Sequence, residues 1–443
     1  MVTEPIQGVQ EHDENSPLDL DVRRSLQKLG ELPPSREVPY LTVSLDWRSE
    51  GTSPGREPAP EVRPSERRST HPEAGPSRRP AKQQIEDEFD ALLETHGPRG
   101  DAFDSLTADV ERIDAYLDAE LDPAAQGVFI VACQAKGLFV PLALGLPMET
   151  RLATGSIPSL SQLALLQDDH PTYALLNADQ KDAVLGFYSQ TNLDQSISID
   201  ATGFSRKQQT GGISQRRLQA RADERVAAFA RGVAEETRKA LDEENVSMLI
   251  IAGDEVITSP LDEAFHQTVK DRIIGTLRLD NNLSSQEIGE AARPLVAAAQ
   301  RAREAAAIAK FQSGLGQGGL AAAGAKATLA ALQVGQVMTL IMNDDVHLDA
   351  WADFDLQTYG VGKAPKKHPA GGDASAIAPV ELDDLLVWLS LQTGADVQII
   401  HTDGPISASE LDEIPDAGQA PPRSEPAMAL DDHGGIGALL RYS

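Results

Sequence analysis

The chain has 443 residues, of which 41% are hydrophobic, and a formal net charge of −29. This length allows about two or three domains of ~100–200 residues each. The single cysteine, Cys133, excludes an internal disulfide and any zinc site built from two or four cysteines. Because the N-terminus has no apolar h-region and no stretch approaches the ~18 apolar residues of a membrane span, we expect a cytoplasmic protein.

The chain begins with polar sequence that does not suggest a core. Residues 1–36 lack apolar periodicity, which predicts a flexible N-terminal segment with one helical turn at 19–28. Residues 39–48 alternate apolar and polar side chains, as a strand does. Residues 49–82 contain seven prolines and almost no apolar side chain, so we expect a disordered, Pro-rich insertion there.

An α+β N-terminal domain is predicted at residues 37–164. Two helices are expected at 83–95 and 101–121, the second with apolar residues at helical spacing. Two short apolar segments, GVFIVAC and GLFVPLAL, follow and are separated by three residues. This spacing predicts a β-hairpin.

Strand patterns recur in the middle of the chain. TYALLNA and AVLGFYS predict a second hairpin, and SISIDATGF predicts a third strand. A long amphipathic helix ending near residue 244 is then predicted by apolar residues that recur every three or four positions: Leu218, Ala222, Val226, Phe229 and Val233. VSMLIIAG is a continuous apolar run typical of a central strand covered on both faces. We place this middle domain at residues 165–266.

The last third alternates helices and strands, which predicts an α/β/α sandwich at residues 267–443. It opens with an Ala-rich helix at 284–312, bent near Pro294. The strand QVMTLIM, a polar loop at 343–378, a helix at 380–393 and the strand DVQIIH follow. GGIGALLRYS is expected to be the final strand, with its glycines allowing a tight entry.

A glycine pair marks the start of a basic stretch. In QQTGGISQRR, residues 208–217, the glycines allow backbone angles that side chains forbid. Between residues 203 and 239 there are nine Lys and Arg against four acidic residues. Arg217, Arg221 and Arg225 recur at i+4 and form one ridge on the predicted helix. Such a ridge binds nucleic-acid phosphates or is a solvated helix face, and charge alone leaves both interpretations open.

Four C-terminal segments and the position of this loop resemble a known family. The segments are GLAAAGAKATLAAL, VMTLIM, ELDDLLVWLSLQTGADVQII and GGIGALLRY. With a Gly-rich loop between a strand and a long helix, they resemble the bacterial and archaeal relatives of eukaryotic-type class-1 peptide-chain release factors, a release-factor-like ribosome-rescue family. The resemblance covers residues 37–443. It implies a ribonuclease-H-like middle domain and a C-terminal α/β/α domain like the kink-turn-binding ribosomal proteins, within an α+β and α/β multidomain chain.

The resemblance also implies a role for the loop. In release factors a Gly-Gly-Gln tip enters the peptidyl-transferase centre and helps water attack the ester that joins peptide to tRNA; a eukaryotic rescue branch has Gly-Ser-Gln there. Gly211 and Gly212 match the glycines, Ser214 and Gln215 match the Ser-Gln pair, and Ile213 intervenes. The basic residues expected to hold RNA are Arg206, Lys207, Arg216, Arg217, Arg221 and Arg225.

The implied function is peptidyl-tRNA hydrolysis on the ribosome in rescue or quality control. Holding one water against an ester is a positioning and electrostatic task that a neutral glutamine can perform, so we expect no cofactor and no metal. The expected partners are the ribosome with its rRNA, peptidyl-tRNA and a translational GTPase, with no membrane and no DNA.

Three alternatives compete with hydrolysis at the loop. A non-catalytic factor, for hibernation or stalled-ribosome recognition, would occupy the ribosomal A site without hydrolysis. A tRNA nuclease is weaker, because no carboxylate cluster or general-base histidine is near the loop in sequence. On local grounds the loop also suits a surface turn with Ser214 as a helix N-cap. The nine histidines are scattered singly, so we expect ordinary loop or surface positions for them.

Overall fold

The computed structural model describes residues 22–48, 79–96, 99–179, 182–189, 192–200, 215–279, 283–316, 319–402 and 423–442. Two compact units divide the chain. One unit contains residues 169–303, and the other contains residues 16–168 together with 304–443. Sheets and helices occur in both units, so the expected α+β and α/β multidomain class is confirmed. Among the described residues, no helix has the length and apolar character that crossing a membrane would need.

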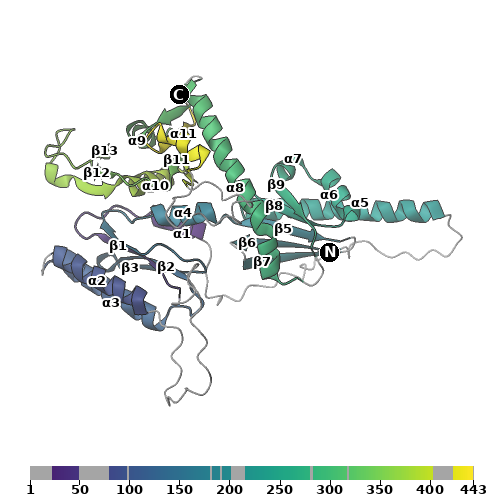
Figure 1. Cartoon of the computed structure of the whole chain (residues 1–443), viewed down its shortest axis with the longest axis horizontal. Helices are drawn as coiled ribbons and strands as arrows, with labels where there is room; N and C mark the ends of the chain where they lie inside the picture. Colours follow the sequence, from purple (N-terminus) through teal and green to yellow (C-terminus); the bar gives the residue numbers. More distant parts are fainter. Residues whose placement is uncertain are drawn as a thin grey trace, which may run out of the picture. The chain divides into compact units, whose positions relative to one another are not determined.

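The N-terminal sheet has the strand order β3-β2-β1-β4. Its strands are β1 (Tyr40–Asp46), β2 (Gly127–Cys133), β3 (Leu138–Leu144) and β4 (Arg151–Gly155). The expected hairpin is present, because β2 and β3 pair antiparallel with Gly127 opposite Leu144. Helices α2 (Arg79–His96) and α3 (Asp101–Ala119) cover one face (Figure 1). The other face packs against α1 (Val22–Gly30) and α4 (Ser161–Asp169).

Helix α1 lies in the segment that the sequence predicts to be flexible. Val22, Leu26 and Leu29 are buried, since they form one apolar face of a nine-residue helix. The helical turn predicted at 19–28 is therefore present in the described residues and extends to Gly30, whereas the prediction of flexibility is wrong for this stretch. Residues 1–21 and 49–78 lie outside the described part of the chain, so the predictions for them are not tested. The last four residues of the insertion predicted at 49–82 belong to a helix that begins at Arg79, so the prediction of disorder is wrong there.

The C-terminal sheet has the order β10-β16-β11-β15. Its strands are β10 (Ala321–Ala323), β11 (Val337–Asn343), β15 (Asp396–Ile400) and β16 (Ile436–Leu440). Leu340 lies on the face of this sheet that packs against α9 (Ala325–Gln333) and α10 (Leu382–Thr393). The next residue, Ile341, lies on the opposite face, which packs against the end of α8 (Ser285–Gly316) and against α11 (Glu425–Asp431). This alternation produces the expected α/β/α sandwich.

The polar loop predicted at 343–378 is largely wrong. A second sheet, β13-β12-β14, is formed there by β12 (Asp349–Asp353), β13 (Thr358–Val361) and β14 (Ala378–Glu381). The strands are only four or five residues long and their sequences, DAWAD, TYGV and APVE, carry little apolar alternation. A strand signal of this length is too weak to distinguish from loop.

The N-terminal and C-terminal sheets share one core. Phe129 and Val131 of β2 belong to the same apolar cluster as Leu385 and Trp388 of α10. The side chain of Gln392 donates to the carbonyl of Gly30 at 2.6 Å, which fixes the end of α1 against α10. These two parts therefore form a single unit.

The unit of residues 169–303 has a five-stranded sheet of order β7-β6-β5-β8-β9. Its strands are β5 (Tyr173–Ala178), β6 (Asp182–Ser189), β7 (Asn192–Asp200), β8 (Leu249–Gly253) and β9 (Ile273–Leu277). The first three form an antiparallel meander, and β8 is parallel to both β5 and β9. As its apolar sequence predicts, β8 is buried on both faces, by two separate apolar clusters.

Helices cover the two faces of this sheet. One face carries α5 (Gln215–Glu243), α6 (Glu255–Ala264) and α7 (Gln267–Lys270), and the other carries the first half of α8 (Figure 1). Pro294 lies inside α8, where the sequence predicts a bend. Since β9 pairs with β8, this unit extends beyond residue 266, where the sequence analysis ends the middle domain.

Candidate functional site

The predicted loop joins β7 to α5. Its residues 201–214 lie outside the described part of the chain, and they include Arg206, Lys207, Gly211, Gly212 and Ser214. Gln215 is the first residue of α5, and Arg216, Arg217 and Arg221 follow in its first two turns. Only the backbone is described for these four residues. Arg225, one turn further, has an exposed side chain.

Helix α5 is much longer than the surface that it covers. It has 29 residues, or about 43 Å at ~1.5 Å per residue. Its described contacts with the sheet and α6 begin at Val226 and continue through Phe229 and Val233 to Leu241. The N-terminal end of α5 projects past the sheet of its unit (Figure 1). The helix therefore presents its first turns away from the body of this unit.

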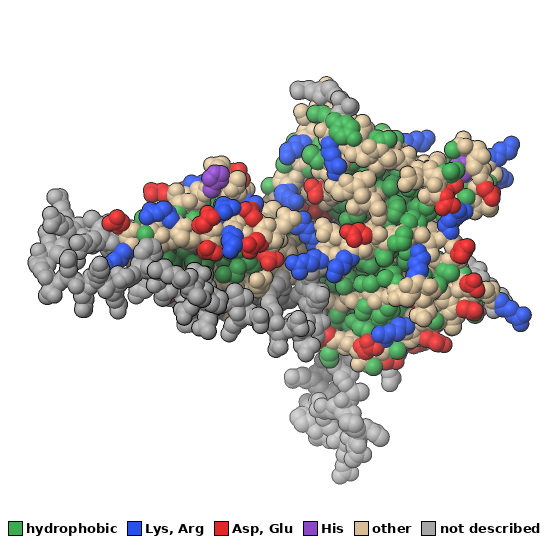
Figure 2. Space-filling view, turned by 180° about the vertical axis from the view of Figure 1, so that it is seen from behind, with side chains coloured by type: hydrophobic (Ala, Val, Ile, Leu, Met, Phe, Trp, Pro, Cys, Tyr) green, Lys and Arg blue, Asp and Glu red, His purple; other side chains and the backbone are tan. Residues whose placement is uncertain are grey.

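Charge is unevenly distributed along this helix. Residues 203–223 contain five Lys and Arg and one acid, whereas residues 224–243 contain four basic and five acidic residues. In the second stretch Arg238 pairs with Glu235 at 2.6 Å and with Asp242 at 3.1 Å. On the face of this unit that Figure 2 shows, basic and acidic side chains are interspersed. The excess positive charge therefore belongs to the loop and to the first turns of α5.

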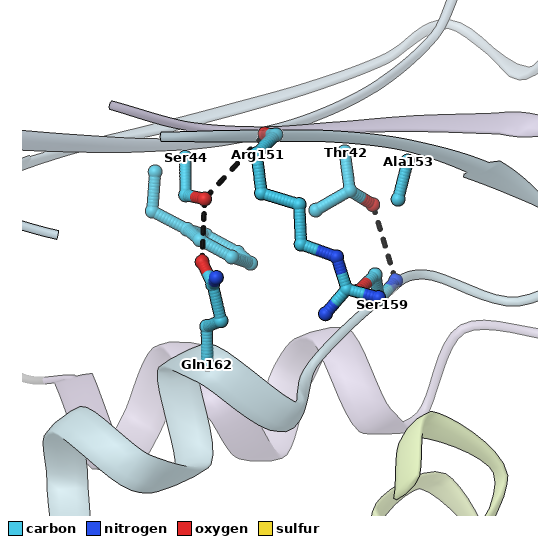
Figure 3. Close-up of a pocket in the computed structure, with 7 residues that line it drawn as sticks. Thr42, Ser44, Arg151, Ala153, Ser159 and Gln162 are labelled. Atoms are coloured by element: carbon cyan, nitrogen blue, oxygen red, sulfur yellow. Dashed lines mark hydrogen bonds between the residues drawn. The ribbon is translucent and has the colours of Figure 1, made fainter. Parts of the chain in front are cut away.

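The other unit has a polar cavity between its N-terminal sheet and α4. Its volume is about 10 Å³, room for roughly one water molecule. The residues labelled in Figure 3 line it: Thr42, Ser44, Arg151, Ala153, Ser159 and Gln162. The hydroxyl of Ser44 donates to Oε1 of Gln162 at 2.5 Å, and the backbone N–H of Ser159 donates to Oγ1 of Thr42 at 3.1 Å. A cavity this small and this well bonded fits a structural water better than a substrate.

Arg151 links this cavity to the first turn of α10. Its Nη2 donates to Oε2 of Glu381 at 2.5 Å. Burial would lower the pKa of Arg151, but the carboxylates of Asp384 and Glu381 outweigh that effect and raise it. Burial raises the pKa of Asp384, and it raises that of Asp383 to about 6 with further contributions from Asp384 and Glu381. Three carboxyl groups therefore surround a single guanidinium.

Two sequence comparisons identify relatives of the chain. Residues 158–301 match the family described as "Bacterial archaeo-eukaryotic release factor family 10". That segment contains the Gly-rich loop, all of α5 and the sheet that holds them. Residues 158–301 are therefore similar to release factors. The chain is 23% identical over 309 residues to peptide chain release factor subunit 1 of Methanocaldococcus jannaschii, covering 64% of this chain and 69% of that relative.

The solved structures to which the chain is similar include two translation factors. The crystal structure of archaeal translation termination factor aRF1 is 13% identical, with 95% of this chain and 97% of that chain covered and a TM-score of 0.22. For S. cerevisiae Dom34, described as a translation termination-like factor, the identity is 12%, the coverage 71% and 79%, and the TM-score 0.36. No function follows from similarities this low.

The C-terminal part of the chain also has a group of potential metal ligands that the sequence analysis misses. Among the described residues, His347, Glu381 and Asp383 can each direct one ligand atom to a common point. Sequence spacing does not reveal this group, because His347 is 34 positions from Glu381 and only strand pairing brings them together. The expectation that histidines occupy ordinary positions also misses His368, whose side chain is fully buried with Nε2 3.2 Å from Asp353.

Proposed function

We propose that this release-factor-like chain acts on the ribosome and hydrolyses the ester of peptidyl-tRNA in ribosome rescue or quality control. Gln215 would be the residue at the ester, with Gly211, Gly212 and Ser214 shaping the tip. The observation that carries the proposal is the family match at residues 158–301, since it spans the loop and the helix that bears Gln215.

The projecting helix supports this assignment. A tip that works inside another particle must extend well beyond its own domain, and α5 begins about 16 Å of helix before its first described core contact at Val226. Gln215 is at the N-terminus of α5, where backbone N–H groups without an intrahelical partner carry partial positive charge. Charge of that sign favours the oxyanion that develops when water attacks an ester.

Glutamine suits the remaining task. Its side-chain amide has both donor and acceptor groups, so it can hold a water in line with a carbonyl without adding a charge. The basic residues Arg206, Lys207, Arg216, Arg217, Arg221 and Arg225 would hold RNA phosphates on either side of the tip. Partnership with a translational GTPase remains an expectation from the family resemblance.

Stalled ribosome–nascent-chain complexes test the proposal. The wild-type protein should release free peptide, and Gln215→Ala should lower the rate at least 100-fold, in line with the loss of a positioned catalytic group. Gln219→Ala is the matched control, because it makes the same change one helical turn further along α5 and should keep the wild-type rate.

Two other outcomes would each replace the proposal. Ribosome binding without peptide release by the wild-type protein would make it a non-catalytic A-site factor. A shortened tRNA on a gel of the same reaction would make it a nuclease. Equal release by the wild-type protein and Gln215→Ala would remove Gln215 from the chemistry.

A further inference from the structure

We propose that His347, Glu381 and Asp383 form a binding site for a divalent transition-metal ion. The site lies in the C-terminal part of the chain, at the start of α10, and is independent of the function proposed for residues 211–215. It adds a ligand that the sequence analysis does not expect.

Strand register brings the three residues together. β12 and β14 pair antiparallel with Asp349 opposite Glu381. One step beyond this pair, the backbone N–H of Leu382 donates to the carbonyl of Leu348 at 2.8 Å. Helix α10 begins at Leu382, and in its first turn Oδ2 of Asp383 is 3.6 Å from Nδ1 of His347, the residue before Leu348. Backbone pairing therefore places the three residues next to one another at the start of α10.

The ligand atoms have suitable spacing. One atom from each residue lies within 4.8 Å of the other two. Ligands at ~2.0–2.2 Å from a tetrahedral ion are roughly 3.4 Å apart, close to the 3.6 Å between His347 and Asp383. The side chains of His347 and Glu381 are exposed, so small rotations can close the remaining gap and leave positions for water. Three protein ligands with water completing the shell is a common arrangement for zinc.

Asp383 supplies evidence beyond the acidic cluster itself. Its side chain is only 2% exposed, yet neither carboxylate oxygen accepts a hydrogen bond of good geometry within the described residues, although the Ser161 hydroxyl and Arg151 are near enough to lower its pKa. Buried charges are normally paired or bound to a metal, because an unpaired one is costly. The neighbouring Asp384 accepts a hydrogen bond from the backbone of Ser161, so it is satisfied in another way. Asp383 is thus the buried acceptor that an ion would use.

Local charge also favours a cation. Asp383, Asp384 and Glu381 all raise the pKa of one guanidinium, that of Arg151, which is already bonded to Glu381. When all are ionised, three negative charges face one positive charge, and a divalent ion would compensate the difference. Glu381 has a second oxygen for the ion, because both oxygens of a carboxylate have lone pairs to share.

The imidazole determines the class of ion. Mg²⁺ and Ca²⁺ prefer shells made only of oxygen, whereas an imidazole nitrogen with carboxylates suits Zn²⁺ and other transition metals. Bound there, the ion would hold β12, β14 and the first turn of α10 together. Glu381 also accepts a hydrogen bond from Arg151 of the N-terminal sheet, so the ion would stiffen the contact between that sheet and α10.

The test is metal binding by the full chain after removal of metals with a chelator. Isothermal titration with Zn²⁺, Mn²⁺ and Mg²⁺ is compared for the wild-type protein, His347→Ala and Asp383→Asn. We expect one Zn²⁺ site per chain, at least tenfold weaker in both variants, and little affinity for Mg²⁺. Asp396→Asn, which changes an exposed acid elsewhere in this part of the chain, should bind Zn²⁺ as the wild type does.

Thermal unfolding gives a second measurement. Zn²⁺ should raise the melting temperature of the wild-type protein, because it binds only the folded state, and should not raise that of His347→Ala. His347 is exposed, so this variant is expected to fold. Undiminished Zn²⁺ affinity in His347→Ala, or no Zn²⁺ binding by the wild type, would overturn the proposal.

Discussion

The backbone N–H of Ser161 donates to Oδ1 of Asp384 at 2.9 Å, across 223 positions of sequence. Ser161 begins α4, beside the N-terminal sheet, and Asp384 lies in the first turn of α10. Both residues are buried. This bond and the neighbouring pair of Arg151 and Glu381 are two of the polar contacts that fix the start of α10 against the N-terminal part of the chain.

Replacing Asp384 should destabilise this unit. Asp384→Ala leaves the buried N–H of Ser161 without its acceptor and removes a carboxylate near Arg151. We expect a loss of about 2–4 kcal/mol in the free energy of unfolding, measured by urea denaturation. Asp384→Asn, which retains an acceptor oxygen, should lose less. The exposed control Asp396→Ala should stay within about 0.5 kcal/mol of the wild type, and a similarly small loss in Asp384→Ala would contradict the prediction.

Asp109 should make stability fall as the pH rises. Burial raises its pKa to about 6 from 3.8, although the backbone N–H of Gln134 and the hydroxyl of Ser105 oppose the shift. Between the unfolded pKa of 3.8 and the folded pKa of about 6, the folded state binds more protons than the unfolded state. The stability contributed by the protonated carboxyl is therefore fully present below about pH 4 and is lost as the pH rises through about 6. The full shift corresponds to about 3 kcal/mol.

A comparison with Asp109→Asn isolates this effect from other titrating groups. The variant keeps the shape of a protonated carboxyl and cannot ionise. Its stability relative to the wild type should therefore increase between pH 4 and pH 7, by up to about 3 kcal/mol in urea unfolding. A stability difference that is flat over this range would show that Asp109 is not perturbed.

Much of the fold follows from local patterns, but the contacts between elements do not. The alternation of Leu41, Val43 and Leu45 predicts β1 correctly. It does not predict that the polar residues Thr42 and Ser44 are buried as well. They are buried because α4, more than 100 residues later, covers the second face and supplies Gln162 as a partner. A sequence pattern reports the preference of one strand, whereas burial depends on which distant element packs on it.

The two candidate sites differ in the same way: one is visible in the local sequence and the other is not. The loop at residues 201–214 carries a motif that is readable from consecutive residues, and its catalytic role stays a prediction. The group of His347, Glu381 and Asp383 arises from the register of two short strands that the sequence analysis assigns mostly to a loop. Pairing between strands of four or five residues leaves almost no periodic signal, so this group could only be found in three dimensions.

Gly437 should not tolerate a side chain. It lies in β16, and a Cβ atom there would be 2.4 Å from Cε2 of Phe311, a fully buried residue of α8. Gly437→Ala should therefore cost about 1–3 kcal/mol of stability in thermal or urea unfolding. Gly232→Ala is the matched control: it lies in α5 with open space around the added methyl, and should stabilise its helix by roughly 0.5–1 kcal/mol. Equal effects of the two substitutions would exclude the steric explanation.

The arginine ridge on α5 should bind RNA through its N-terminal half. Arg217→Glu combined with Arg221→Glu reverses two charges where basic residues are in excess. Arg231→Glu combined with Lys239→Glu makes the same change in charge on the same helix, at exposed positions further from the loop. Ribosome or tRNA association is measured for both double variants across a salt series, because phosphate contacts weaken as salt rises.

The two double variants should differ in RNA binding if the position of the arginines determines affinity and the net charge of the chain does not. Each arginine that contacts a phosphate contributes roughly 0.7–0.9 to the slope of log affinity against log salt. The first variant should therefore bind at least tenfold more weakly near 0.1 M salt, with a slope smaller by about 1.5, and the second should retain the wild-type slope. Equal losses in both would mean that the acidic chain responds only to its overall charge. Wild-type binding by the first variant would make the ridge a solvated helix face.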